Sequence, residues 1–460
     1  MTLFAGATTR VRKGDGHTGG KRNDPVHPQK ESQMKNRRTR QVGTVVVMTA
    51  MLAVLAVPTS LPAAAVDVPD QVLAWNQYAY NELIVTKLQP PPVSVLNLAI
   101  VHGAVYDAVN AIDGGYEPYL VSPSAASNAS EDAAAAAAAY QVLLSMLPDR
   151  ASVLLGDYNA SLAAIAGAGV SQARIDAGVA VGEAAAAAMI LERTGDGRGG
   201  TTLFTEGTLP GQWRRVPLVT GGNSFRWVGQ VKPFLVNNAQ QFATVGPKEL
   251  SSEAYADEFE QVKKLGRATD STRTPNQTSI ALFWSDHAVA MWTRMFRQIS
   301  IAQDLSTAEN ARFFAELYLT GADALITCFE DKETTHFWRP QTAIQEADND
   351  TNPATHADPA WTSLIPTPPY PDHPSGHNCI SGSFVRTLQQ FFGTNVMSFS
   401  ATHSVNGITR SYTRFGQAIS EIKRARVFGG LHFWSADAQG ARLGRRVANW
   451  RQAHYFQPVA

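Results

Sequence analysis

The stretch KETTHFWRP, residues 332–340, is followed in this chain by PSGH at residues 374–377 and by RVFGGLH at residues 426–432. Together the three segments hold one lysine and two arginines, whose charges persist at pH 7 and suit a bound oxyanion. They add a Ser-Gly pair as short donors, and two histidines as a proton carrier and a nucleophile or metal ligand. The residues concerned are Lys332, Arg339, Ser375, Gly376, His377, Arg426 and His432.

The first segment predicts two cations aimed at one anion. Lys332 and Arg339 are seven residues apart, so two turns of a continuous helix would place them on one face, and Pro340 would end that helix. Phe337 and Trp338 indicate apolar surroundings, in which a guanidinium needs an anionic partner. The alternative is a solvated basic helix edge, which the neighbouring aromatic residues disfavour.

The other two segments complete the predicted site. PSGH is typical of a helix N-terminus, where free N–H groups and the helix dipole favour an anion, and Gly376 lets the backbone approach it closely. Arg426 and His432 are six residues apart and cannot share a helical face, so the Gly-Gly pair between them must turn the chain. His432 could then coordinate a metal through Nε2 or attack phosphorus. The alternatives are a capped helix with an incidental histidine and an ordinary buried histidine.

Helical periodicity dominates the chain and strand patterns are almost absent, so we predict an all-α protein of two helical bundles. The 460 residues suffice for a large core. We expect an N-terminal extension with a signal (1–65), an N-terminal bundle (66–195), an irregular connection (196–247) and a C-terminal bundle with the oxyanion site (248–460). Helices are expected at 70–86, 93–112, 130–147, 151–166, 171–192, 251–265, 278–299, 306–328, 377–392, 412–425 and 435–453.

The N-terminus has the pattern of an export signal. Residues 35–40 are basic, residues 42–57 are apolar and uncharged, and residues 63–65 are alanines suited to cleavage. We expect a secreted or extracytoplasmic protein that uses the Sec route or, given an Arg-Arg pair, the twin-arginine route. Met34 is a plausible true start, and a membrane anchor is the alternative reading of the apolar stretch. No later segment is predicted to span a membrane.

Net charge limits the class of ligand, and the cysteines leave two redox states possible. Without residues 1–65, the chain carries 29 Lys+Arg and 36 Asp+Glu. This mildly acidic balance argues against nucleic-acid binding, which needs a basic surface. The two cysteines, Cys328 and Cys379, each stand close to one of the motifs, and either a disulfide or two buried thiols is compatible with that placement.

In order and spacing, Lys-x6-Arg-Pro, Pro-Ser-Gly-His and Arg-x5-His resemble the superfamily that joins vanadium-dependent haloperoxidases to type-2 phosphatidic acid phosphatases and bacterial acid phosphatases. The resemblance covers about residues 332–437. The segments HGAVYDAVNAI at 102–112 and FWRP at 337–340 are similar to the haloperoxidase branch. Membrane phosphatases of this superfamily carry several spans and the small soluble ones are much shorter, so the resemblance implies a vanadium chloroperoxidase-like fold.

The resemblance also implies a cofactor and roles for the motif residues. The cofactor would be vanadate, for which phosphate can substitute. His432 would be the axial ligand bonded to vanadium, and His377 would hydrogen-bond the opposite apical oxygen and act as acid–base. Lys332 would also polarise bound peroxide towards halide. The equatorial oxygens would be held by Lys332, Arg339, Ser375, Gly376 and Arg426.

Three positions depart from the family pattern or need a partner. The pattern places an aspartate four residues after the last histidine, but Ala436 stands there and Asp437 follows it, which we interpret as a helix cap. A carboxylate usually supports the acid–base histidine, and Asp286 is our candidate to support His377. Tyr370 occupies a family position proposed to influence halide choice, without deciding between chloride and bromide.

The predicted function is that of a vanadium-dependent haloperoxidase, which oxidises bromide or chloride with hydrogen peroxide to hypohalous acid or a halogenated organic acceptor. The alternative is an exported acid phosphatase, in which His432 becomes phosphorylated and His377 protonates the leaving alcohol. Phosphate and vanadate are nearly isosteric, so the residues around the anion do not separate these two. A vestigial, non-enzymatic pocket is disfavoured because all seven motif residues are present. A homo-oligomer is compatible with the sequence.

Overall fold

The computed structural model of the protein describes residues 70–216 and 225–459. The predicted extension and signal, residues 1–65, lie outside the described residues. Within the described part, helices dominate and the strands form a single two-stranded sheet, so the predicted all-α class is confirmed. The first group of helices is α1 (Gln71–Tyr80, continued by a π-helical turn over Asn81–Thr86), α2 (Pro91–Asp113), α3 (Glu131–Met146), α4 (Ala151–Gly167) and α5 (Gln172–Glu192), with a 3-10 turn η2 (Pro148–Arg150).

A long irregular segment separates this group from the next. Among its described residues the one helical turn is η3 (Arg226–Gln230), and Asp323 pins the chain by accepting the N–H groups of residues 234, 235 and 236. A domain boundary at 196–247 stays a prediction. The later elements are α6 (Glu253–Gly266), α7 (Pro275–Phe283), α8 (Ala288–Ala302), α9 (Thr307–Thr335), α10 (Pro340–Gln345), η4 (Ala347–Asn349), α11 (Gly376–Phe391), β1 (Val396–Thr402), β2 (Thr409–Arg414), α12 (Phe415–Phe428) and α13 (Trp434–His454).

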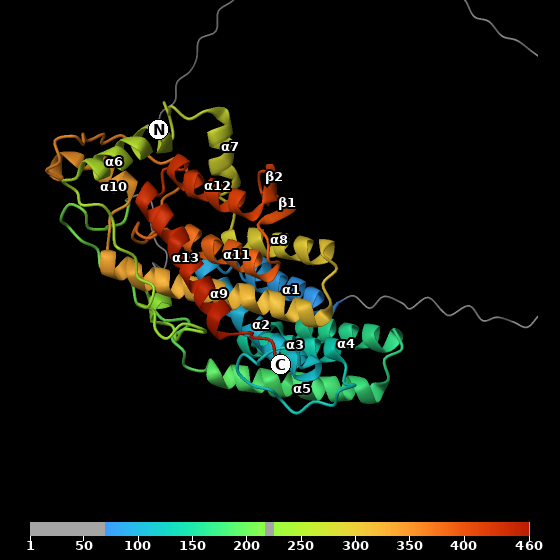
Figure 1. The fold of residues 1–460 in the computed structure, drawn as a ribbon. Coiled ribbons are helices and arrows are strands. Elements are labelled where there is room, and N and C mark those ends of the chain that lie inside the picture. The colour runs from blue at the N-terminus through green and yellow to red at the C-terminus, as the bar shows by residue number, and fades with distance from the viewer. Residues whose placement is uncertain (1–69, 217–224, 460) are drawn as a thin grey trace, which may run out of the picture. The chain divides into compact units, whose positions relative to one another are not determined.

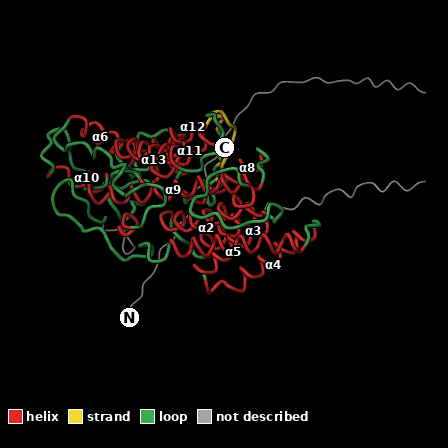
Figure 2. The backbone as a smooth tube through the Cα atoms, turned by 60° about the horizontal axis from the view of Figure 1, so that its bottom comes forward, coloured by secondary structure: helices red, strands yellow, loops and turns green. Residues whose placement is uncertain are grey.

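Helix α9 joins the two groups of helices. A capping box formed by Ser306 and Glu309 starts it. It packs against α2 on one side and against α11 and α13 on the other, and Figure 1 and Figure 2 both show it running between them. Most of α9 is buried, including Lys332 near its C-terminal end. The helix therefore carries a lysine into the interior, where its charge needs polar partners.

Helix α2 is the one helix of the described chain that is long and apolar enough to cross a membrane by length and composition. In the structure it is a core helix, because 78% of its most apolar window is buried. The segment 102–112, which resembles haloperoxidases, lies on it. His102 is fully buried there, with Nε2 2.9 Å from Asn76 Nδ2, so this histidine serves packing in the core.

Small residues bring helices into close contact at two places. Ala133–Ala139 of α3 are all buried, and a Cβ on Gly182 of α5 would come 2.3 Å from the α3 backbone. On α13, a Cβ on Gly444 would come 2.0 Å from the carbonyl oxygen of Cys379 in α11. The second contact sets the position of the first turns of α11, which carry the PSGH segment.

The continuous helix predicted at 278–299 is wrong, because the structure has two helices, α7 and α8, with a turn at residues 284–287. His287 starts α8 by accepting the N–H of Ala290 on its Nδ1 at 3.1 Å. Histidine is an unusual N-cap residue, so the sequence carried no clear signal that a new helix begins after residue 287.

The helix predicted from residue 412 is also wrong at its start. Thr409–Arg414 forms β2, which pairs antiparallel with β1, and α12 begins only at Phe415. The aromatic rings of Phe399 and Tyr412 stack across the hairpin with centroids 5.2 Å apart. The pair buries Tyr412 against Phe399, whereas the sequence pattern placed Tyr412 at the start of a helix.

Candidate functional site

Lys332 and Arg339 approach the same pocket, but the prediction that one helix carries both is wrong. Helix α9 ends at Thr335, because His336 adopts a left-handed conformation with φ of 46° and donates its N–H to the carbonyl of Lys332. Pro340 starts α10 rather than ending a helix. The turn between the two helices, and not a shared face, brings the cations together.

Main-chain carbonyls hold both cations in the interior. Lys332 Nζ donates to the carbonyls of Pro371 at 2.6 Å and Asp372 at 3.0 Å. Arg339 Nε donates to the carbonyl of Tyr370 at 2.8 Å. Lys332 and Arg339 also lie 5.3 and 5.0 Å from the centroid of the Tyr370 ring. The loop before α11 therefore binds both cations through its backbone.

The PSGH segment starts α11 as predicted, with Ser375 as the N-cap residue and Gly376 as the first helical residue. His377 follows, and its Nε2 is buried without a hydrogen-bond partner among the described residues. Burial, helped by the charge of Arg426, lowers the pKa of His377 well below its usual range. The ring is therefore neutral, with one nitrogen as donor and the other as acceptor.

Arg426 lies at the end of α12, and Gly430 with φ of 76° turns the chain towards His432, as the Gly-Gly pair predicted. Arg426 Nη1 donates to the carbonyl of Trp284 at 3.0 Å. Burial lowers the pKa of Arg426 to about 10, so it stays charged at neutral pH. Nε2 of His432 lies 3.0 Å from Arg339 Nη1, which joins the first and third motifs in space.

These groups meet at one cavity of about 260 Å³. Gly376, His377, Arg426 and His432 are part of its wall. The remaining predicted residues lie behind that wall: Arg339 contacts His432 and Tyr370, Lys332 lies over Tyr370, and Ser375 is buried at the start of α11. Apolar side chains complete the wall, and they include Leu325, Phe329 and Ile380.

Unpaired polar atoms indicate what the cavity can hold. Nη2 of Arg339, Nε of Arg426 and Nε2 of His377 are buried and have no hydrogen-bond partner among the described residues. Buried polar atoms without partners are costly, and the two guanidinium nitrogens can only donate, so Arg426 in the cavity wall and Arg339 behind it point to a ligand with acceptor oxygens. The donor set fits a tetrahedral or trigonal-bipyramidal oxyanion. No three His, Cys, Asp or Glu of the described chain gather as a metal cage.

The prediction that Asp286 supports His377 finds no contact in the described structure. The carboxylate of Asp286 accepts from Arg294 at 2.6 Å, from the N–H and hydroxyl of Ser404, and from the N–H of His287. Asp286 lines the cavity, yet both its oxygens are engaged. Its contacts fasten the β-hairpin turn to α8.

Asp437 is not the helix cap that we predicted. It lies in the first turn of α13, fully buried, and its Oδ1 accepts from Asn378 Nδ2 at 2.7 Å. The same amide nitrogen lies 3.2 Å from Ser375 Oγ. Burial raises the pKa of Asp437 well above its usual range. Asp437 therefore supports the first turn of α11 through Asn378.

Asp372 is the residue of this site that the sequence analysis missed. Its Oδ1 lies 2.8 Å from Nδ1 of His432 and 3.9 Å from Nη1 of Arg339. Burial raises the pKa of Asp372 to about 7, although the charges of Arg339 and Lys332 oppose the shift. The available signal was an acidic residue in the run PYPDHPSGH, directly before the second motif.

The two cysteines are buried free thiols rather than a disulfide. Cys328 on α9 donates its thiol to the carbonyl of Pro374 at 3.6 Å. Cys379 on α11 packs under Gly440 of α13, where an added Cβ would come 3.3 Å from its sulfur. Both thiols therefore act as small core residues between the helices that carry the motifs.

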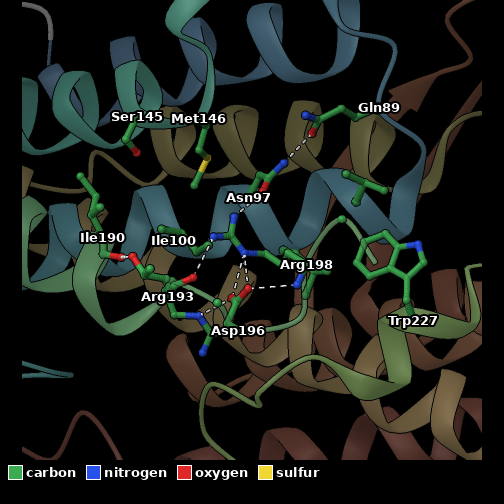
Figure 3. A pocket seen from close by; sticks show the side chains of 15 residues that line it. Gln89, Asn97, Ile100, Ser145, Met146, Ile190, Arg193, Asp196, Arg198 and Trp227 are labelled. Carbon is green, nitrogen blue, oxygen red and sulfur yellow. Dashed lines mark hydrogen bonds and ion pairs between the residues drawn. The ribbon is translucent and has the colours of Figure 1, made fainter. Parts of the chain in front are cut away.

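A second cavity, of about 450 Å³, lies among the helices of the first group. Figure 3 shows its charged groups bound to one another: Asp196 accepts from Arg193 and Arg198, and Arg198 donates to Asn97 at 2.9 Å. Because Asp196, Asn97 and main-chain carbonyls engage the donors of both arginines, this cavity offers no free cationic donor to an anion. We therefore place the functional site at the motif cavity.

Fold and site together define an all-α protein with a buried, cationic oxyanion pocket at the start of a core helix. Residues 312–460 match the family model of the VCPO second helical-bundle domain. This part of the chain matches that domain family, and the resemblance to vanadium-dependent haloperoxidases seen in the sequence is confirmed.

Known vanadium haloperoxidases are similar to this chain in sequence and in fold. The vanadium chloroperoxidase of Curvularia inaequalis is 26% identical over 204 residues, which cover 36% of this chain and only 33% of that relative. A bacterial vanadium-dependent iodoperoxidase has a similar fold, with a TM-score of 0.71 and 21% identity over 85% of this chain and 98% of that one. A bacterial vanadium-dependent chloroperoxidase in its holo form has a TM-score of 0.63 and 13% identity over 79% and 91%.

Proposed function

We propose that this protein is a vanadium-dependent haloperoxidase that oxidises halide with hydrogen peroxide. The observation that carries the proposal is one buried cavity that has Arg426 and two neutral histidines in its wall, with Arg339 and Lys332 directly behind that wall. The fold shared with haloperoxidases over most of the chain supports it. Bound vanadate would supply a Lewis acid that activates peroxide. The product would be hypohalous acid or a halogenated organic acceptor.

The residues of this chain would supply charge, orientation and proton transfer. The free donors Nη2 of Arg339 and Nε of Arg426 would bind oxyanion oxygens, and Lys332 would add its charge from behind. His377, neutral with a free Nε2, would take up the proton that peroxide releases on binding. His432 would hold the anion through Nε2. Leu325 and Phe329 would limit the access of water.

Bromide or chloride is the substrate that we expect from the sequence. The structural neighbours are named for iodide and for chloride, so the assay should include all three halides. Tyr370 lies in the cavity wall beside both Lys332 and Arg339, which makes it the residue at which halide preference should first be tested.

One observation favours a phosphatase as the second candidate. A phosphohistidine mechanism needs a carboxylate that orients the nucleophilic ring, and Asp372 stands 2.8 Å from Nδ1 of His432. A paired assay separates the two functions: bromination of a phenolic dye with peroxide after vanadate loading, and hydrolysis of p-nitrophenyl phosphate. We expect halogenation with little hydrolysis. Hydrolysis without halogenation would overturn the proposal in favour of the phosphatase.

The charge of Lys332 should make anion binding depend on pH. Burial lowers the pKa of Lys332 to about 8, with Arg339 contributing. The ammonium form holds the anion and is lost as pH rises through this value, so vanadate and phosphate affinity should fall above about pH 8. Titration calorimetry at pH 6.5 to 9.5 measures the effect. A Lys332→Met variant separates it from ionisation of the ligand itself, and an unchanged pH profile in that variant would contradict the assignment.

A further inference from the structure

We propose that Asp372 is the residue that positions His432, in place of the aspartate that the family pattern puts four residues after this histidine. The inference rests on the proposed function, because it concerns the ring that would bind vanadium. It assigns a role to a side chain that lies outside the three motifs and comes from a different part of the chain.

The backbone of Asp372 is fastened at both ends of the residue. Its N–H donates to the carbonyl of Phe337 at 2.9 Å, and its own carbonyl accepts from Lys332 Nζ at 3.0 Å. The side chain is 1% exposed. A carboxylate on so constrained a backbone has little freedom, so it can hold a partner ring in one orientation.

The contact of Asp372 with His432 favours one tautomer of the imidazole ring. Oδ1 of Asp372 lies 2.8 Å from Nδ1, which is hydrogen-bonding distance. A carboxylate there binds an Nδ1–H and leaves the lone pair on Nε2. Nε2 lies 3.0 Å from Arg339 Nη1, on the cationic side of the pocket. The 2.8 Å contact is close without the angles of a regular hydrogen bond, and the N–H of Phe433, the residue after this histidine, also acts on the carboxyl of Asp372 and opposes the rise of its pKa that burial causes.

The residues after His432 in the chain do not provide this support. Ala436 stands at the family position and has no polar side-chain atom, and it is fully buried. The neighbouring Asp437 points its Oδ1 at Asn378 instead, at 2.7 Å. Asp437 therefore supports the start of α11, while Asp372 from the loop before α11 faces the ring.

The comparison of two anions tests this role. Vanadium(V) can accept a bond from a ring nitrogen, whereas inorganic phosphate is held by hydrogen bonds and charge alone. Asp372→Ala should therefore weaken vanadate binding by about 10- to 100-fold, as for partners of metal-ligating histidines. Phosphate binding should change by less than about threefold, because its donors are untouched. Calorimetry with orthovanadate and with inorganic phosphate on the same vanadate-depleted protein measures both.

Three further variants make the test specific. Asp372→Asn keeps the shape of the side chain and one acceptor oxygen, so its vanadate affinity should lie between those of wild type and Asp372→Ala. Asp331→Asn changes another buried carboxylate of this region, which accepts the N–H of Thr244, and should leave the ratio of the two affinities unchanged. In the Asp372→Ala/His432→Ala double variant, vanadate should bind no more weakly than in His432→Ala alone, because both changes remove one interaction.

Equal weakening of vanadate and phosphate in Asp372→Ala would overturn the proposal, and so would wild-type vanadate affinity in that variant. The outcome is separable from the fate of the proposed function. A wild-type protein that binds vanadate but oxidises no halide would refute the function while the affinity ratios still tested Asp372. A halogenating protein with an unaltered ratio in Asp372→Ala would refute only the role of Asp372.

Discussion

A His432→Ala variant should retain no vanadate through gel filtration, because only charge and hydrogen bonds would still hold the anion, whereas His377→Ala should retain it and turn over about 10²- to 10⁴-fold more slowly, the usual cost of losing an acid–base group. The reason is the different position of the two rings. His432 offers Nε2 on the cationic side of the pocket, held between Arg339 and Asp372. His377 has a free Nε2 in the cavity wall but contacts none of the described carboxylates, so it can serve proton transfer without holding the anion.

Vanadium retained after gel filtration, measured by elemental analysis, and peroxide-dependent bromination give the two readouts. His454→Ala is the matched control, because this exposed histidine lies at the end of α13 and stacks on Trp450. The His454→Ala variant should match wild type in vanadium retention and in bromination. Equal vanadium retention in the His432 and His377 variants would show that the roles are assigned wrongly.

A Gly444→Ala variant should be destabilised by about 3 kcal/mol, at the upper end of what overpacking costs. An added Cβ would come 2.0 Å from the carbonyl oxygen of Cys379 and 2.6 Å from the N atom of Ser383. Both are backbone atoms, so α11 and α13 must move apart. Because Ser375, Gly376 and His377 stand at the start of α11, we also expect weaker phosphate binding in the folded fraction.

Urea denaturation followed by circular dichroism checks the first effect. Gly156→Ala is the control, because this helix-interior glycine of α4 has nothing within 4 Å of the added Cβ. The change there should stabilise by up to about 1 kcal/mol through helix propensity. A Gly444→Ala protein as stable as wild type would show that the close contact of the two helices is not needed.

The residue types of the site and the start of the helix that carries PSGH could be predicted from the sequence, because both depend on local signals. Ser375 and Gly376 after a proline are typical of a helix start, and α11 begins where they predict. Most predicted helices agree with the structure within a few residues for the same reason. Prediction was wrong where a local signal was weak, as at His336, whose left-handed conformation ends α9 between the two cations.

The partners of the histidines were not readable from the chain. Asp286 was chosen for His377, yet its oxygens are taken by Arg294 and Ser404. Asp372, which had no assigned role, faces His432 instead. The sequence does not indicate which side chain an acidic residue will contact, because that contact depends on the packing of distant segments.

By itself, then, the sequence determined where most helices start and which ionisable side chains and donors the pocket would contain, since helix caps and residue types are local properties, whereas burial in the fold sets the pKa values of those side chains. Only the tertiary structure decided that Lys332 and Arg339 converge across a turn and that Asp372 rather than Asp437 meets His432. Those contacts arise where α9, α11 and α12 pack together, and helix packing is a property of the whole fold.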